Sequence, residues 1–101
     1  MMIKIRIGKE KTHWLVIDNV KDIEYEYRDA KESYELYKIN KQQQVPVRWI
    51  EHFSMKDLKG RKVAMVTVRY KDCPDEIIFT DDSIYILNDE GKTCDSVGVY
   101  N

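Results

Sequence analysis

The fold is decided by residues 63–70, which read Val63-Ala64-Met65-Val66-Thr67-Val68-Arg69-Tyr70. Consecutive positions of this stretch are apolar or β-branched, so a strand built from it presents such side chains on both of its faces. A strand of this kind lies inside a sheet and has a neighbour on each side. Residues 63–70 therefore predict a central β-strand.

Short segments with strand periodicity follow. Residues 76–81 and 83–88 predict two strands, and Asp81-Asp82 separates them. Asn88-Asp89-Glu90-Gly91 is typical of a hairpin loop, in which Gly91 takes the positive φ angle that glycine tolerates. Residues 92–100 then complete the sheet. The predicted core consists of Val63, Ala64, Val66, Val68, Ile77, Phe79, Ile84, Ile86 and Leu87.

The N-terminal part also alternates with a period of two. Residues 2–7 place apolar side chains between basic ones, which favours a strand over the continuous apolar run of a signal peptide. Residues 12–17 predict a second strand, and the two form a hairpin. Asp18-Asn19 indicates a turn. Val45, Val47 and Trp49 alternate again, and Pro46 favours an edge position because it cannot donate to a ladder.

The region between these parts has two interpretations. Ile23, Tyr25 and Tyr27 predict an amphipathic strand, and residues 34–39 can return as its partner, which gives a tyrosine-rich hairpin. The alternative is a helix within residues 29–42, in which Asp29 is the cap and Ala30, Tyr34 and Tyr37 share a face. Residues 50–59 are ambiguous in the same way.

The expected fold is mainly β: a small antiparallel barrel or sandwich of about seven short strands, with room for one short helix. The alternative is an α+β fold with a helix within 29–42 or 50–59. The chain has 101 residues, and we expect one domain over residues 1–101.

No motif in the sequence predicts catalysis. The potential metal ligands His13, His52, Cys73 and Cys94 are far apart in sequence, and no two of them have the spacing of a local pair. Gly91-Lys92-Thr93 resembles the end of a phosphate loop, but the required earlier glycine is replaced by Ile86. We therefore expect a protein that is not an enzyme and has no metal and no cofactor. Whether Cys73 and Cys94 pair is left open.

The net charge of −1 hides two blocks of opposite sign. Residues 56–71 hold six basic residues and one acid, Asp57, whereas residues 72–95 hold eight acids and one basic residue, Lys92. The acids fall mostly in predicted turns, and a hairpin fold brings alternate turns to the same end. The sequence thus predicts an acidic end for electrostatic recognition, formed by Asp72, Asp75, Glu76, Asp81, Asp82, Asp89 and Glu90.

Four of the seven tyrosines, Tyr25, Tyr27, Tyr34 and Tyr37, lie within thirteen residues and are interleaved with charged residues. Tyrosine is enriched at protein interfaces, so we predict these four as contact anchors for a protein partner. The interleaved glutamates disfavour nucleic-acid stacking because they repel phosphates.

Together these features favour a small non-enzymatic protein-binding module that acts stoichiometrically in the cytoplasm on a partner with a basic groove. One version is an inhibitor, encoded by a phage or mobile element, of a host nucleic-acid-binding defence enzyme. The first alternative is an assembly subunit that self-associates through edge strands. The second is a nucleic-acid-binding barrel that uses residues 56–71 with Trp49 and Tyr70. No membrane partner is expected, because no apolar run is long enough to cross a bilayer.

Overall fold

The central strand of the fold is β5 (Lys62–Tyr70), as residues 63–70 predict. In this computed structural model, which describes residues 1–7, 13–50 and 58–98, β5 pairs antiparallel with β3 (Val20–Asp29) and β6 (Glu76–Thr80). Val66 lies opposite Tyr25 on one side and Ile78 on the other. Both neighbours satisfy the backbone hydrogen bonds of β5. Its side chains are apolar on both faces because Val66 and Val68 belong to one buried cluster and Val63 to another.

The fourth strand of this sheet, which we call the β5 sheet, is β4 (Val47–Ile50). It pairs in parallel with β6 and ends the order β3-β5-β6-β4, so the edge position predicted from Pro46 is confirmed. Pro46 lies just before the strand, where its carbonyl accepts a hydrogen bond from the amide of Ile77 at 3.0 Å.

A second sheet, the β1 sheet, has the order β2-β1-β7-β8. It contains β1 (Met2–Ile7), β2 (His13–Ile17), β7 (Ile84–Leu87) and β8 (Thr93–Val97). The predicted hairpin of the first two strands and the loop at Asn88–Gly91 are both confirmed, with Gly91 at φ 80°. The strands predicted over residues 76–81 and 83–88 are confirmed as β6 and β7. They belong to different sheets, and residues 81–83 cross between them.

The prediction of a return strand over residues 34–39 is wrong. Residues 30–42 form the helix α1 (Ala30–Gln42), which was the alternative interpretation. The Asp29 carboxylate caps it by accepting a hydrogen bond from the Glu32 amide at 3.1 Å, and Ala30 and Ser33 are buried on its inner face. Capping and a buried helical face outweigh the strand preference of the tyrosines. The helix alternative for residues 50–59 falls largely on residues 51–57, outside the described part.

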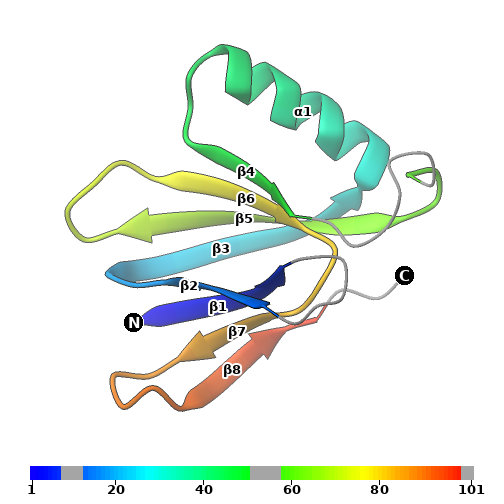
Figure 1. The fold of residues 1–101 in the computed structure, drawn as a ribbon. Helices are drawn as coiled ribbons and strands as arrows, with labels where there is room; N and C mark the ends of the chain where they lie inside the picture. Colours follow the sequence, from blue (N-terminus) through cyan, green and yellow to red (C-terminus); the bar gives the residue numbers. More distant parts are fainter. Residues whose placement is uncertain (8–12, 51–57, 99–101) are drawn as a thin grey trace.

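The described elements form three layers (Figure 1): the β1 sheet, the β5 sheet and α1. One buried cluster, which includes Ile3, Ile5, Val66, Ile78 and Ile84, lies between the sheets. A second cluster, Ala30, Val63 and Phe79, lies under the helix. The fold is thus mainly β and sandwich-like, with eight described strands and one short helix.

The predicted core is largely confirmed. Val63, Ala64, Val66, Val68, Phe79, Ile84 and Leu87 are buried. Ile77 and Ile86 are partly buried and pack against the two clusters.

Candidate functional site

The tyrosines predicted as one hairpin lie in two separate places. Tyr25 and Tyr27 are on β3, a terminal strand of the β5 sheet, and each is 51% exposed. Their ring centroids are 6.0 Å apart in an edge-to-face arrangement. The Tyr27 hydroxyl donates a hydrogen bond to the carbonyl of Gly98, which follows β8. This bond joins β3 to the chain segment after β8. The two side chains form a compact aromatic surface.

Tyr34 and Tyr37 belong instead to the packing of α1 on the β5 sheet. Both rings contact Trp49 of β4, with centroid distances of 5.2 and 5.8 Å, and Trp49 in turn contacts Phe79 at 5.4 Å. The correction follows from the helix: positions 34 and 37 are one turn apart and share the face that packs inward. The structure thus separates these two predicted anchors from Tyr25 and Tyr27.

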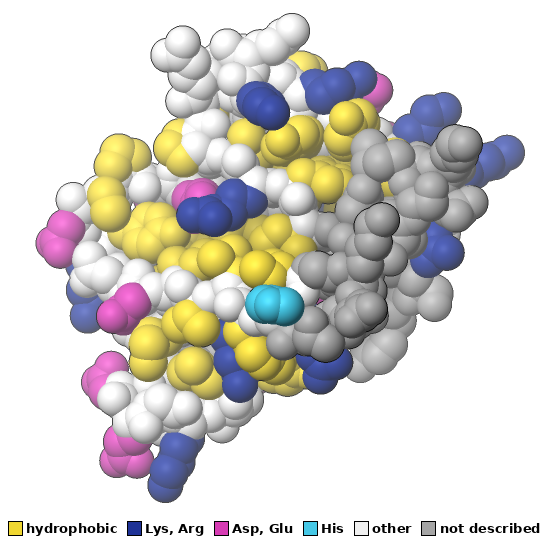
Figure 2. Space-filling view, viewed as in Figure 1, with side chains coloured by type: hydrophobic (Ala, Val, Ile, Leu, Met, Phe, Trp, Pro, Cys, Tyr) yellow, Lys and Arg dark blue, Asp and Glu magenta, His cyan; other side chains and the backbone are white. Residues whose placement is uncertain are grey.

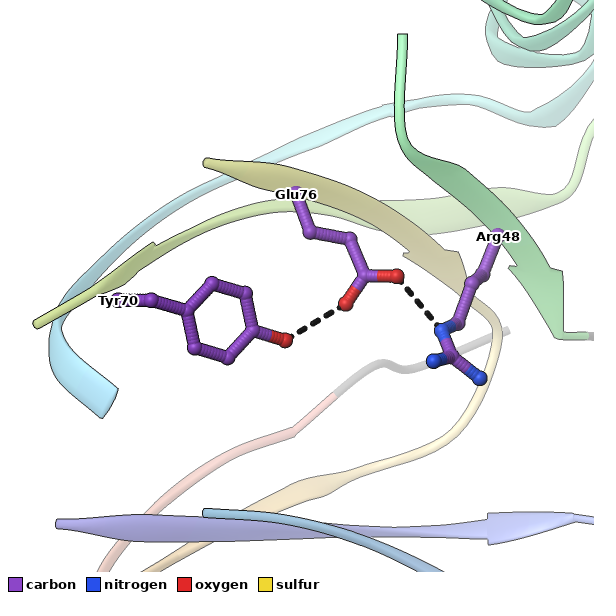
Figure 3. A network of polar contacts seen from close by, with 3 residues as sticks. All are labelled: Arg48, Tyr70 and Glu76. Carbon is purple, nitrogen blue, oxygen red and sulfur yellow. Dashed lines mark hydrogen bonds and ion pairs between the residues drawn. The ribbon is translucent and has the colours of Figure 1, made fainter. Parts of the chain in front are cut away.

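Glu76 does not contribute to an acidic surface, because only 8% of this residue is exposed to solvent. Figure 3 shows its carboxylate between two partners: it accepts hydrogen bonds from Arg48 Nε at 2.7 Å and from the Tyr70 hydroxyl at 2.7 Å. These contacts neutralise and orient the carboxylate. The sequence pattern does not distinguish Glu76 from the neighbouring turn acids, because its partners lie 28 and 6 residues away.

Tyr70 provides a pH-dependent contribution to stability. Burial, and then the hydrogen bond to Glu76, raise the pKa of Tyr70 above its usual value of 10.0. The folded state therefore keeps a proton that the unfolded chain releases, so this contribution is complete below about pH 10 and declines as the pH rises further. We expect the wild-type free energy of unfolding to approach that of Tyr70→Phe as the pH rises from about pH 10 to about pH 11.

Urea denaturation across this pH range measures the effect. The slope should stay well below the ceiling of about 1.4 kcal/mol per pH unit for one proton, because Tyr70 is partly exposed to solvent. Tyr25→Phe leaves the Arg48–Glu76–Tyr70 contacts intact, so we expect it to follow the wild-type curve. If wild type and Tyr70→Phe differ by a constant amount at every pH, the proposed linkage is wrong.

The remaining predicted acids are divided between two ends of the molecule. Asp72 and Asp75 lie in the β5–β6 loop and Asp89 and Glu90 in the β7–β8 loop, which reach the same end (Figure 1). Asp18, in the β2–β3 turn, lies there too. A hollow of about 230 Å³ is lined by residues of all three connections. Figure 2 shows Asp and Glu side chains along this edge of the molecule.

Two local features order this acidic end. The Asn19 side-chain amide donates to the Asp72 carboxylate at 3.0 Å, which ties the β2–β3 turn to the β5–β6 loop. The Asn88 side chain accepts from the amides of Glu90 and Lys92 at 2.9 and 3.0 Å, which shapes the β7–β8 loop. Lys71 and Lys92 lie in the same loops and reduce the negative charge.

Asp81 and Asp82 are separate from this end. They lie in the β6–β7 crossing at the opposite end of the molecule and are half-buried. The Asp81 amide donates to the carbonyl of Ile50 at 3.3 Å, at the end of β4. Alternate turns do converge, because the β5–β6 and β7–β8 loops lie at the same end. Asp81 and Asp82 lie in the connection between those two loops, and this places them outside the acidic end.

The basic block of residues 56–71 forms no shared stacking surface with Trp49 and Tyr70 in the described residues. Trp49 packs under α1, and the Tyr70 hydroxyl is bonded to Glu76. Arg69 contacts Asp22 at 2.8 Å and Glu24 at 2.9 Å on β3, and these hydrogen bonds raise its pKa. Part of the basic block is thus used for cross-strand pairing.

A different aromatic and basic surface was missed by sequence reasoning. Trp14 and Tyr85 contact each other on the outer face of the β1 sheet, and Lys4 and Arg6 lie beside them. The alternation of residues 2–7 indicates that Lys4 and Arg6 share a face, but Tyr85 is distant in sequence and is brought there by the pairing of β7 with β1.

Cys73 and Cys94 are both free and exposed. Among residues 1–7, 13–50 and 58–98, no group of three His, Cys, Asp or Glu is placed to hold a metal ion. Within the same part of the chain, no helix has both the length and the apolar character needed to cross a membrane. The chain matches no known family model, no curated protein and no solved structure.

Proposed function

We propose that this protein is a non-catalytic protein-binding module and that its partner contacts the β3 side of the β5 sheet. The observation that carries the proposal is the half-exposed pair Tyr25 and Tyr27 on a terminal strand. Exposed tyrosines provide large contact areas at low entropic cost and are frequent binding hot spots. Tyr34 and Tyr37 are left out of the proposed surface because they pack on Trp49.

A hollow beside Tyr25 supports a partner with basic side chains. It has a volume of about 270 Å³ and is lined by Glu24, Tyr25, Glu26, Met65 and Thr67. Glu24 forms an ion pair with Arg69, and Glu26 forms one with Arg28, each at 2.9 Å. Both glutamate side chains are exposed. A carboxylate has several acceptor positions, so each glutamate can accept a further hydrogen bond from an incoming Arg or Lys.

The acidic end of the molecule supports the same class of partner. Asp18, Asp72, Asp75, Asp89 and Glu90 outnumber Lys71 and Lys92 there. Such a charge distribution mainly accelerates association with a positively charged surface and improves specificity. A protein with a basic groove fits both features. One such module is a cytoplasmic inhibitor, encoded by a phage or mobile element, of a nucleic-acid-binding defence enzyme. Its carboxylates would occupy the basic groove in which the enzyme binds phosphates.

Affinity purification with matched variants tests the proposal. The tagged protein is incubated with a lysate of the organism that encodes it, and bound proteins are quantified by mass spectrometry. We expect one protein to be enriched by wild type and lost with Tyr25→Ala/Tyr27→Ala. Its measured Kd should rise by about tenfold to a hundredfold, the usual range for interface hot spots. Tyr27→Phe separates the effect of its hydroxyl from that of its ring.

The control variant is Ile39→Ala, which removes another exposed large apolar side chain, from α1. It should enrich the same partner as wild type. Loss of the partner with Ile39→Ala but not with the tyrosine variant would contradict the proposed surface. A wild-type dimer by light scattering that the tyrosine variant converts to a monomer would favour the assembly alternative. For the inhibitor version, no complex with a candidate nuclease in gel filtration argues against that enzyme.

A further inference from the structure

The outer face of the β1 sheet carries a second recognition surface. In β1, Ile3 and Ile5 are fully buried, so the alternating residues Lys4 and Arg6 point away from the core. Lys4 lies opposite Val16 of β2 and Tyr85 of β7, and Arg6 lies opposite Trp14 of β2. Three neighbouring strands thus place two cations and two aromatic rings on one face.

The four side chains form one connected group. Trp14 and Tyr85 have ring centroids 5.7 Å apart and meet edge to face. Lys4 Nζ lies 4.4 Å from the Trp14 ring centroid and 5.9 Å from that of Tyr85, and the Arg6 guanidinium carbon lies 5.4 Å from the Trp14 centroid. These contacts hold both cations beside the rings, and Trp14 still remains 42% exposed.

Among the described residues of these strands, the charged side chains that the pairing places on this face are Lys4 and Arg6, and both are basic. β1, β2 and β7 contain no Asp or Glu. In β8, Asp95 lies opposite Ile86, on the other side of the pleat, whereas Ser96 lies opposite Tyr85 on this face. The carboxylates of the proposed protein-binding surface lie on β3 and in the loops. The outer face of the β1 sheet is therefore complementary to a polyanion.

We propose that this face binds single-stranded nucleic acid, with Trp14 and Tyr85 as stacking platforms and Lys4 and Arg6 beside the phosphates. Surfaces that bind single strands without sequence preference combine aromatic rings with cations along the backbone, and a duplex hides its bases from such rings. Polyglutamate would satisfy the two cations but has no aromatic ring to stack on the exposed indole. This inference does not depend on the proposed protein partner, because it uses the other sheet.

Fluorescence anisotropy of a labelled oligothymidylate of about 12 nucleotides at low salt tests the proposal. We expect binding that Trp14→Ala weakens by between about fivefold and about 150-fold, the range for losing one stacked base, whereas Trp14→Phe retains most of the affinity. With two cations, the logarithm of the affinity should fall with the logarithm of the salt concentration at a slope of about −1.4. Lys4→Gln should reduce that slope by about half.

Lys31→Gln is the matched control, since it removes one exposed cation from α1 and should leave the affinity nearly unchanged. Thermal unfolding by circular dichroism verifies that each variant is folded. The proposal is overturned if the oligonucleotide does not bind to the folded wild type, or if Trp14→Ala binds it as well as wild type does. It is also overturned if polyglutamate or duplex DNA competes as effectively as the unlabelled single strand.

Discussion

Replacing Phe79 with alanine is expected to lower the free energy of unfolding by about 3–5 kcal/mol. Phe79 is fully buried in β6, opposite Met65 of β5 and Trp49 of β4. It forms a cluster with Ala30 and Val63 that joins the β5 sheet to α1. Removing the ring loses its transfer free energy and leaves a cavity that neighbouring strands and helix fill only in part. Urea denaturation followed by circular dichroism measures the change.

The same substitution should lower the local stability of α1 more than that of the two sheets. A helix of thirteen residues is marginal in water by itself and depends on its packed face. We therefore expect faster amide hydrogen exchange in α1 of Phe79→Ala than in β1. Phe79→Leu keeps most of the apolar volume and should cost less than about half as much. A loss below about 1 kcal/mol for Phe79→Ala would mean that the helix layer contributes little to stability.

Replacing Ile5 with alanine is expected to cost about 2–5 kcal/mol, through the other core cluster. Ile5 is fully buried, and it lies opposite Leu15 of β2 and Ile84 of β7. Its cluster also contains Val66 and Ile78 of the β5 sheet, so the lost methyl groups come from the contact between the two sheets. Thermal and urea unfolding should both report the loss.

Two matched variants in the β1 sheet make this result interpretable. Ile5→Val removes one methylene group and should cost about 0.5–1.5 kcal/mol. Val16→Ala removes a β-branched residue at a 53% exposed position of β2. We expect it to lower the free energy of unfolding by less than about 1 kcal/mol. If Val16→Ala costs as much as Ile5→Ala, β-propensity rather than burial between the sheets governs the stability of this layer.

The two recognition proposals use surfaces that the core variants of Phe79 and Ile5 do not touch. Tyr25 and Tyr27 lie on β3, and Trp14, Lys4 and Arg6 lie on the outer face of the β1 sheet. Each proposal has its own readout, a partner protein in one case and an oligonucleotide in the other. The failure of one test therefore leaves the other intact.

Much of the fold follows from local patterns in the sequence. Residues 63–70 indicate a central strand because both faces are apolar or β-branched, and Pro46 indicates an edge because it lacks a donor. Asn88–Gly91 indicates its loop because Gly91 tolerates a positive φ angle. Each of these features depends on residues that are close together in the chain.

The helix was harder to predict, since Tyr34 and Tyr37 fit both a strand and a helical face. The interpretation as a helix depends on the cap at Asp29 and on Trp49 and Phe79, which provide the surface on which the helix packs. The predicted tyrosine hairpin fails for this reason. Intrinsic propensities differ by less than about 1 kcal/mol per residue, so tertiary packing decides between them.

For this protein, the sequence by itself determined the strand-rich class, the central strand, most of the core and the charge blocks, because each rests on periodicity or on neighbouring residues. Only the tertiary structure decided which of these residues meet. It buries Glu76 between Arg48 and Tyr70 and brings Tyr85 to Trp14. These outcomes depend on strand order and on the change of sheet after β6, and pairing between distant segments sets both.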